Sequence, residues 1–194
     1  MLATSNSGKY THEKQLTRLT VDKFYEVIDG ELVKAAPNGG LHHFITANLY
    51  SALQRFVAAH RSGMIFTYGL MYLLEWEDKR LYNAQIPDVS FVRKGMLPKT
   101  WDIRRPFPGA PVLAVEVMSY AEKAERVLRR TRQYLRFGAE QVWIVFPDAK
   151  EVHQYRRGAD IIRVYTGADT MEIDDLFPGL TLTLTEIFAM PDLS

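Results

Sequence analysis

The order in which helical and strand-like patterns follow one another constrains the fold of this chain more than any other feature. Apolar residues recur at intervals of three and four over residues 41–63, which is typical of an amphipathic helix. Three strand-like runs follow, and then a strand, a second helix and another strand. In order, the segments are LHHFITANLYSALQRFVAAHRSG, MIFTYG, LMYLLEW, IPDVSFV, PVLAVEVMS, YAEKAERVLRRTRQYLRFG and QVWIVF. This order predicts a mixed α/β domain built on one central sheet.

Added β-hairpins are predicted at both ends of this core. Near the amino-terminal end, Asp29-Gly30 separates two short extended runs, and this dipeptide favours a two-residue hairpin turn. Toward the other end, EVHQY and IIRVY are joined at RRGAD. We therefore expect a single domain over residues 19–194, preceded by a flexible polar tail over residues 1–18.

The charge balance and the absence of cysteine exclude several classes of protein. Lys and Arg number 24 against 23 Asp and Glu, so the net charge gives no argument for a nucleic-acid or membrane partner. Without cysteine, the chain has no disulfides, no thiolate catalysis and no sulfur-ligated metal. No apolar segment is long enough for a signal peptide or a membrane span. We expect a soluble, cytoplasmic protein with no membrane partner.

Two of the most apolar runs each contain one carboxylate, Asp88 in IPDVSFV and Glu116 in VLAVEVMS. An ionised carboxylate loses its hydration when it is buried, so it needs a partner such as a cation. The intervening loop is long enough for the two strands to pair, which would bring the side chains within roughly 5 Å. Oxygen ligands at that separation suit one Mg²⁺ or Mn²⁺ ion. The spacing alone leaves a second interpretation open, in which one or both acids are solvated at a strand end.

Several motifs in this chain occur in the order found in a known nuclease family. PDVSFV, VLAVEVMS, YLRFGAEQVWIVFPDAKEVHQYR and FPGLTLTLTEIF, together with YEVIDGELV and the helix that carries His42, resemble the Uma-two family of putative restriction endonucleases. The likeness covers roughly residues 20–190. That family belongs to the PD-(D/E)xK nuclease superfamily. The resemblance therefore implies a restriction-endonuclease-like fold, in which a mixed central sheet is flanked by helices.

The resemblance also implies a site and a substrate. Pro87 and Asp88 correspond to the PD motif and Glu116 to the second acid, with the carbonyl of Val117 as a third ligand of Mg²⁺ or Mn²⁺. The implied function is metal-dependent hydrolysis of phosphodiester bonds in DNA. The family also implies a homodimer.

The cations of this chain depart from the family pattern. The superfamily lysine often follows the Glu by two residues, where this chain has Met118. The Uma-two pattern instead places a lysine fourteen residues after the Glu and an Asp four residues before that lysine, where this chain has Arg130 and Arg126. Arginine can orient a phosphate, but its pKa above ~12 makes it a poor proton acceptor. Lys123 shares the helix edge of these arginines and is a candidate substitute. The alternative function is therefore a catalytically impaired member that binds nucleic acid or a protein.

Three further polar residues are candidate accessory groups. Glu31 follows the hairpin turn, where the family also has an acid, and His42 corresponds to a histidine near the start of the family's first long helix. Gln85 lies just before the PD motif and could bond water or phosphate. Each also has an ordinary interpretation: a surface glutamate, a half-exposed histidine in a first helical turn, and a polar residue at a strand end.

Overall fold

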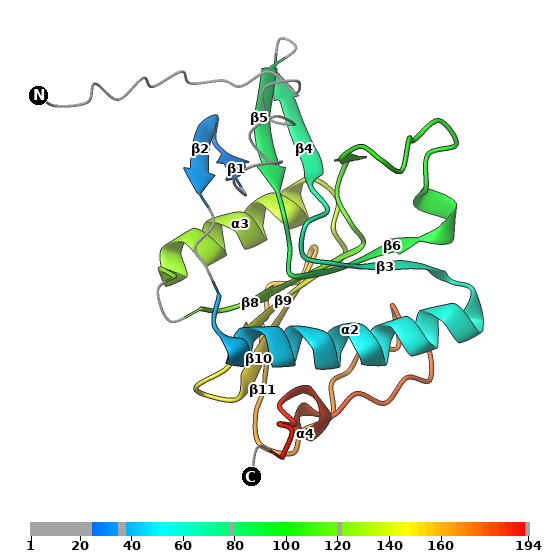
Figure 1. Cartoon of the computed structure of the whole chain (residues 1–194), viewed down its shortest axis with the longest axis vertical. Coiled ribbons are helices and arrows are strands. Elements are labelled where there is room, and N and C mark those ends of the chain that lie inside the picture. Colours follow the sequence, from blue (N-terminus) through cyan, green and yellow to red (C-terminus); the bar gives the residue numbers. More distant parts are fainter. Residues whose placement is uncertain (1–24, 35–37, 78–79, 120–121, 193–194) are drawn as a thin grey trace, which may run out of the picture.

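The computed structural model describes residues 25–34, 38–77, 80–119 and 122–192, and it has a mixed α/β architecture (Figure 1). The predicted tail, residues 1–18, lies outside the described residues. The strands divide between two sheets rather than forming the single sheet that the order of elements predicts. The chain leaves the larger, six-stranded sheet after β3 (Gly63–Thr67), and Gly69 then adopts a φ of 119° that favours glycine.

The larger sheet has six strands and carries most of the core. In spatial order they are β11 (Arg163–Tyr165), β10 (Glu151–Arg156), β9 (Gln141–Phe146), β8 (Leu113–Val117), β6 (Val89–Arg93) and β3 (Gly63–Thr67). Strands β8 and β9 are parallel, whereas every other neighbouring pair is antiparallel. The sheet is therefore mixed, and the β10–β11 hairpin is present as predicted.

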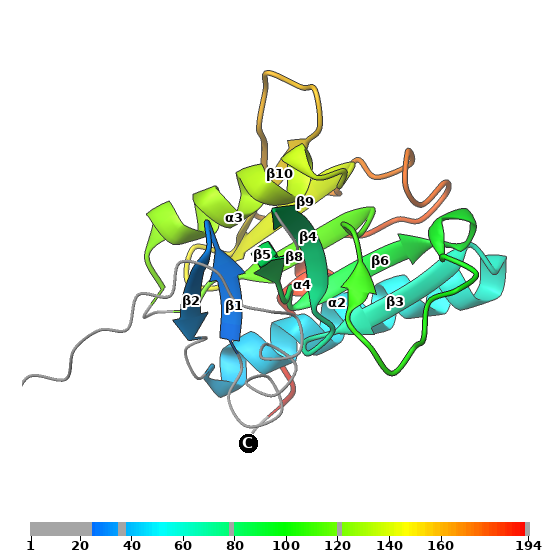
Figure 2. The same cartoon turned by 90° about the horizontal axis from the view of Figure 1, so that it is seen from above.

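The two long helices cover opposite faces of this sheet. Helix α2 (Gly40–His60) buries Leu49 and Leu53 against Val115 of β8. Helix α3 (Ala124–Arg136) buries Tyr134 against Ala114, the preceding residue of the same strand. Successive side chains of a strand point to opposite faces, so the two helices sandwich β8 between them (Figure 2). The connection from β8 through α3 to β9 is the crossover that a parallel strand pair requires.

The second sheet holds the amino-terminal hairpin. Its order is β2 (Glu31–Lys34), β1 (Tyr25–Ile28), β5 (Arg80–Gln85), β4 (Tyr72–Glu77) and β7 (Phe107–Pro108). Asp29 and Gly30 have φ values of 52° and 78°, which fits the predicted hairpin turn. Strand β5 was not predicted, because the buried Asn83 and Gln85 hide its apolar character in the sequence.

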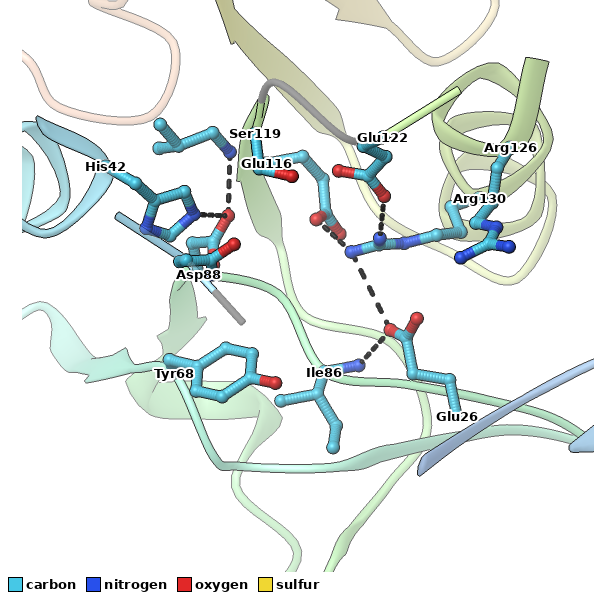
Figure 3. A pocket seen from close by; sticks show the side chains of 12 residues that line it. Glu26, His42, Tyr68, Ile86, Asp88, Glu116, Ser119, Glu122, Arg126 and Arg130 are labelled. Atoms are coloured by element: carbon cyan, nitrogen blue, oxygen red, sulfur yellow. Dashed lines mark hydrogen bonds and ion pairs between the residues drawn. The ribbon is translucent and has the colours of Figure 1, made fainter. Parts of the chain in front are cut away.

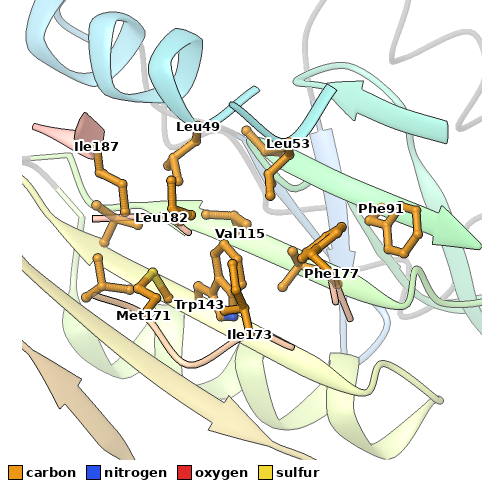
Figure 4. Close-up of a cluster of buried hydrophobic side chains, with 14 of the residues drawn as sticks. Leu49, Leu53, Phe91, Val115, Trp143, Met171, Ile173, Phe177, Leu182 and Ile187 are labelled. Atoms are coloured by element: carbon orange, nitrogen blue, oxygen red, sulfur yellow. The ribbon is translucent and has the colours of Figure 1, made fainter. Parts of the chain in front are cut away.

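The carboxy-terminal part of the chain completes the core on the α2 side (Figure 4). Met171, Ile173, Phe177 and Leu182 are buried there. The alternating Thr and Leu residues form only an isolated bridge from Thr183 to Thr170 before the short helix α4 (Leu184–Ile187). Between β6 and β7 the chain has a single turn of 3-10 helix, η1 (Lys94–Met96). Across the described ranges, no helix has both the length and the apolar character needed to cross a bilayer.

Candidate active site

Strand pairing brings Asp88 and Glu116 to one cavity. Val89 lies opposite Val115 in the β6–β8 register, and continuing this register places Asp88 beside Glu116. Glu116 faces α3, because it is two residues from Ala114, which packs on that side. Both acids line the same cavity, and both are nearly buried, with 5% and 2% of their surface exposed (Figure 3). Solvation at a strand end is therefore the wrong interpretation for either acid.

Asp88 is held by groups from two neighbouring elements. Its Oδ2 accepts a hydrogen bond of 2.7 Å from the Val117 backbone N–H and lies 3.2 Å from Nε2 of His42. His42 belongs to the first turn of α2, and it is buried rather than half-exposed. Its other ring nitrogen, Nδ1, has no hydrogen-bond partner among the described residues. The predicted accessory histidine is thus in contact with the first carboxylate.

Arg130 lies in the cavity and forms ion pairs with three glutamates. Its Nη2 is in close contact with Oε2 of Glu116 and lies 3.6 Å from Oε1 of Glu26. Its Nη1 lies 2.8 Å from Oε1 of Glu122. Arg130 is buried despite its place on a cationic helix, whereas Arg129, Arg132 and Arg136 are exposed as expected. Because the helix is rich in arginine, the sequence pattern does not distinguish the buried Arg130 from its exposed neighbours.

Two of these glutamates, Glu26 and Glu122, were not predicted as site residues. Glu26 of β1 accepts a 2.9 Å hydrogen bond from the Ile86 backbone N–H, and its carboxylate reaches the cavity. The predicted hairpin acid, Glu31, is instead exposed on β2 and does not line the cavity. The helical pattern in the sequence starts at residue 120, but α3 begins only at Ala124. Glu122 therefore lies before the helix, where its carboxylate can reach Arg130. The signal for Glu26 was its place two residues before Ile28, on the buried face of a short strand.

Burial and the charge of Arg130 are the largest influences on the pKa values of the glutamates in the cavity. Burial raises the pKa of Glu116 well above its usual value, and the charges of Asp88 and Glu26 add to this effect against the opposing influence of Arg130. Burial likewise raises the pKa of Glu26. For Arg130, burial acts to lower the pKa, but Glu116 and Glu26 outweigh it and hold the pKa well above its ordinary value. Burial and the nearby carboxylates raise the pKa of Tyr68 to about 12. A cation in this cavity would thus be favoured.

The donor set and the size of the cavity fit a hard divalent ion. The cavity volume is about 50 Å³, which has room for an ion with a few water molecules. Oε1 of Glu116 is buried and has no hydrogen-bond partner among the described residues, so it is available as a ligand. As the described side chains stand, no three acidic or histidine groups are placed to share one ion. Two carboxylates with water completing the shell are nevertheless usual for Mg²⁺.

The remaining predicted residues differ in their distance from the cavity. Val117 and Arg126 line it, and Arg126 forms no ion pair with any described residue. Lys123 is exposed at the N-cap of α3 and does not line the cavity, so the structure does not bring this predicted lysine to the carboxylates. Gln85 is fully buried and does not line the cavity, and its side-chain amide donates to Gln133.

Comparisons with known proteins agree with the motif resemblance. The family model Uma2, described as a putative restriction endonuclease, matches residues 13–185. A crystal structure of a putative nuclease belonging to DUF820 from Anabaena variabilis superposes with a TM-score of 0.75 at 19% identity, covering 86% of this chain and 90% of that chain. No match to a curated protein was found. The predicted family and fold class are confirmed.

Proposed function

Because the chain belongs to the Uma2 family of putative restriction endonucleases, we propose that it hydrolyses phosphodiester bonds in DNA with the help of a divalent metal ion. The observation that carries this proposal is the convergence of Asp88 and Glu116 on one cavity that also contains Arg126 and Arg130. This combination of buried acids and cations suits a metal ion and a phosphate together.

Asp88 and Glu116 would hold Mg²⁺ or Mn²⁺, with the Val117 carbonyl as a third ligand. When bound, the ion acidifies water and offsets negative charge on the phosphate and the leaving oxygen. His42 and the Val117 N–H keep the Asp88 carboxylate in one orientation. Arg126, which has no carboxylate partner among the described residues, is free to bind a phosphate oxygen.

Arg130 favours a second candidate function, a family member that binds nucleic acid or a protein but cleaves poorly. Arg130 stands where the family pattern has lysine, and its guanidinium does not accept a proton near neutral pH. Both of its terminal nitrogens are also paired with carboxylates. Among the described residues that line the cavity there is no lysine to replace it.

Titration of the purified protein with Mn²⁺ and a nuclease assay together separate these functions. An endonuclease should bind Mn²⁺, and it should cleave double- or single-stranded DNA in the presence of Mn²⁺ or Mg²⁺. The Asp88→Ala, Glu116→Ala double variant should lose both properties. A protein that binds the metal and DNA but leaves DNA and RNA intact would favour the binding function. Absence of metal binding in the wild type would refute the proposed endonuclease.

We also propose a cytoplasmic homodimer, since the family resemblance implies a dimer and the chain lacks cysteine. Ile161, Ile162 and Val164 are exposed beside or within the edge strand β11, which leaves apolar surface to cover. Light scattering at micromolar concentration should give twice the monomer mass of 22.3 kDa. A species of monomer mass alone would contradict the dimer.

A further inference from the structure

Three glutamates from separate parts of the chain surround the guanidinium of Arg130. Glu26 comes from β1, Glu116 from β8, and Glu122 from the segment that precedes α3. Their side chains are 5%, 3% and 15% exposed, and that of Arg130 is 8% exposed. The cluster therefore lies almost entirely away from solvent, beside Asp88 in the same cavity (Figure 3).

The charges in this cluster do not balance. One guanidinium faces three carboxylates, although buried ionised groups are normally paired with a compensating charge. One oxygen, Oε1 of Glu116, is buried without any hydrogen-bond partner among the described residues. Glu116 can therefore bind an ion beside Asp88 through Oε1 while its Oε2 pairs with Arg130, and the three carboxylates keep an excess of negative charge that a cation would offset.

From this geometry we infer that Glu26, Glu116 and Glu122 form a second cation subsite, which the chain fills with its own Arg130 guanidinium. The inference deepens the proposed function and rests on it, because Asp88 and Glu116 would hold the first ion. Arg130 would then limit the wild-type protein to one divalent ion. A positively charged side chain in place of a second ion would still stabilise charge near the phosphate, but it could not acidify a water molecule.

The shape of the guanidinium explains why these glutamates do not form a metal site as they stand. An arginine holds carboxylates at N–O distances near 2.8 Å on the outside of a planar group, as Glu122 shows. A divalent ion such as Mg²⁺ needs oxygens at roughly 2.0–2.1 Å around a single point. Removing the guanidinium would leave room for the three carboxylates to move toward one another, by rotation about side-chain bonds.

The test compares Mn²⁺ stoichiometry in the wild type, in Arg130→Gln and in the triple variant Arg130→Gln, Glu26→Gln, Glu122→Gln. Isothermal titration and the Mn²⁺ electron paramagnetic resonance signal each count bound ions without any nuclease reaction. We expect one ion in the wild type, two in Arg130→Gln and one in the triple variant. Arg136→Gln removes an exposed arginine from the same helix and should bind one ion.

Four other outcomes would each overturn the second subsite, the proposed function or both. One ion in both the wild type and Arg130→Gln would overturn the second subsite and leave the proposed function standing. No ion in the wild type but one in Arg130→Gln, lost in the triple variant, would support the subsite and refute the proposed function. An extra ion that persists in the triple variant would overturn the subsite, and no ion in any variant would overturn both proposals.

A folding measurement covers the case in which Arg130→Gln is unstable without metal. Circular dichroism melts should then show a lower melting temperature for Arg130→Gln that Mn²⁺ restores in a saturable manner, as expected when an ion binds only the folded state. A variant that stays unfolded at saturating Mn²⁺, while the triple variant folds, would overturn the subsite.

Discussion

Replacing Arg130 by lysine tests whether proton transfer limits DNA cleavage by this protein. Lysine is the residue that the family pattern has at this position, and its amine, with an ordinary pKa of about 10.4, releases a proton far more readily than a guanidinium. A positioned proton-transfer group contributes roughly 10²–10⁴-fold to a rate. We therefore expect Arg130→Lys to cleave DNA faster than the wild type, by up to this factor.

The same substitution should lower the stability of the fold by a limited amount. Nη1 of Arg130 pairs with Glu122 and Nη2 pairs with Glu116, so two different nitrogens serve two carboxylates. The compact ammonium of lysine would lose one of these contacts, and a hydrogen bond to a charged group contributes about 1.5–3 kcal/mol. Typical domains are stable by about 5–15 kcal/mol, so Arg130→Lys should remain folded with a lower free energy of unfolding.

The assay measures cleavage of a fluorescent DNA substrate with Mn²⁺, alongside urea unfolding and Mn²⁺ titration of each variant. Arg136→Lys is the matched control, because it makes the same chemical change at an arginine whose side chain is 71% exposed. Lys123→Ala should leave cleavage unchanged, since Lys123 does not line the cavity. The reasoning is refuted if Arg130→Lys is folded and binds Mn²⁺ as the wild type does, yet cleaves no faster.

Three other predictions follow from the contacts of the cavity. His42→Gln should weaken Mn²⁺ binding by about 10–100-fold because Asp88 loses its orienting partner, and calorimetry showing unchanged affinity, with His43→Gln as control, would contradict this. Arg126→Gln should leave Mn²⁺ binding unchanged but weaken DNA binding, and the salt dependence of DNA affinity should fall by about one phosphate contact. The control Arg157→Gln, at an exposed arginine outside the cavity, should change neither DNA affinity nor its salt dependence. Folding raises the pKa of Glu116 above its usual 4.5, so the folded protein binds this proton more tightly than the unfolded chain does. The resulting stabilisation is complete below pH 4.5 and is lost as the pH rises through the raised pKa. Metal-free wild type should therefore lose stability relative to Glu116→Gln from pH 4.5 upward, and parallel melting curves for the two proteins would argue against it.

The sequence revealed the features of the site that conflict with their surroundings. Asp88 and Glu116 interrupt apolar strands, and Asp29-Gly30 is a strong local signal for a hairpin. Glu26 and Arg130 gave no such conflict, because a glutamate in a short strand and an arginine in a basic helix are ordinarily exposed. The spacing of Glu26 and Ile28 is only a weak signal in so short a strand, and the burial of Arg130 depends on partners such as Glu26, about a hundred residues away in the chain.

The division into two sheets escaped prediction for a related reason. The polar residues of β5 are buried by hydrogen bonds: Asn83 accepts from the backbone N–H of Asp29, and Gln85 donates to Gln133. A strand of this kind lacks the alternation on which sequence analysis depends. Since β5 links β1 to β4, missing it also concealed the second sheet that carries Glu26.

The aromatic contacts of Phe177 have a consequence for the order of events during protein synthesis. Its ring centroid lies 5.0 Å from that of Phe91 in β6 and 6.4 Å from that of Trp143 in β9, so it supports the sheet on the side that α2 covers. A ribosome translates every cavity-lining residue before it reaches Phe177. Domains generally fold as units, and the strands that hold Asp88 and Glu116 lack part of their core until this residue emerges. Any hydrolytic activity should therefore be confined to chains translated past this point, and an arrested nascent chain would be a substrate for proteolysis rather than a nuclease.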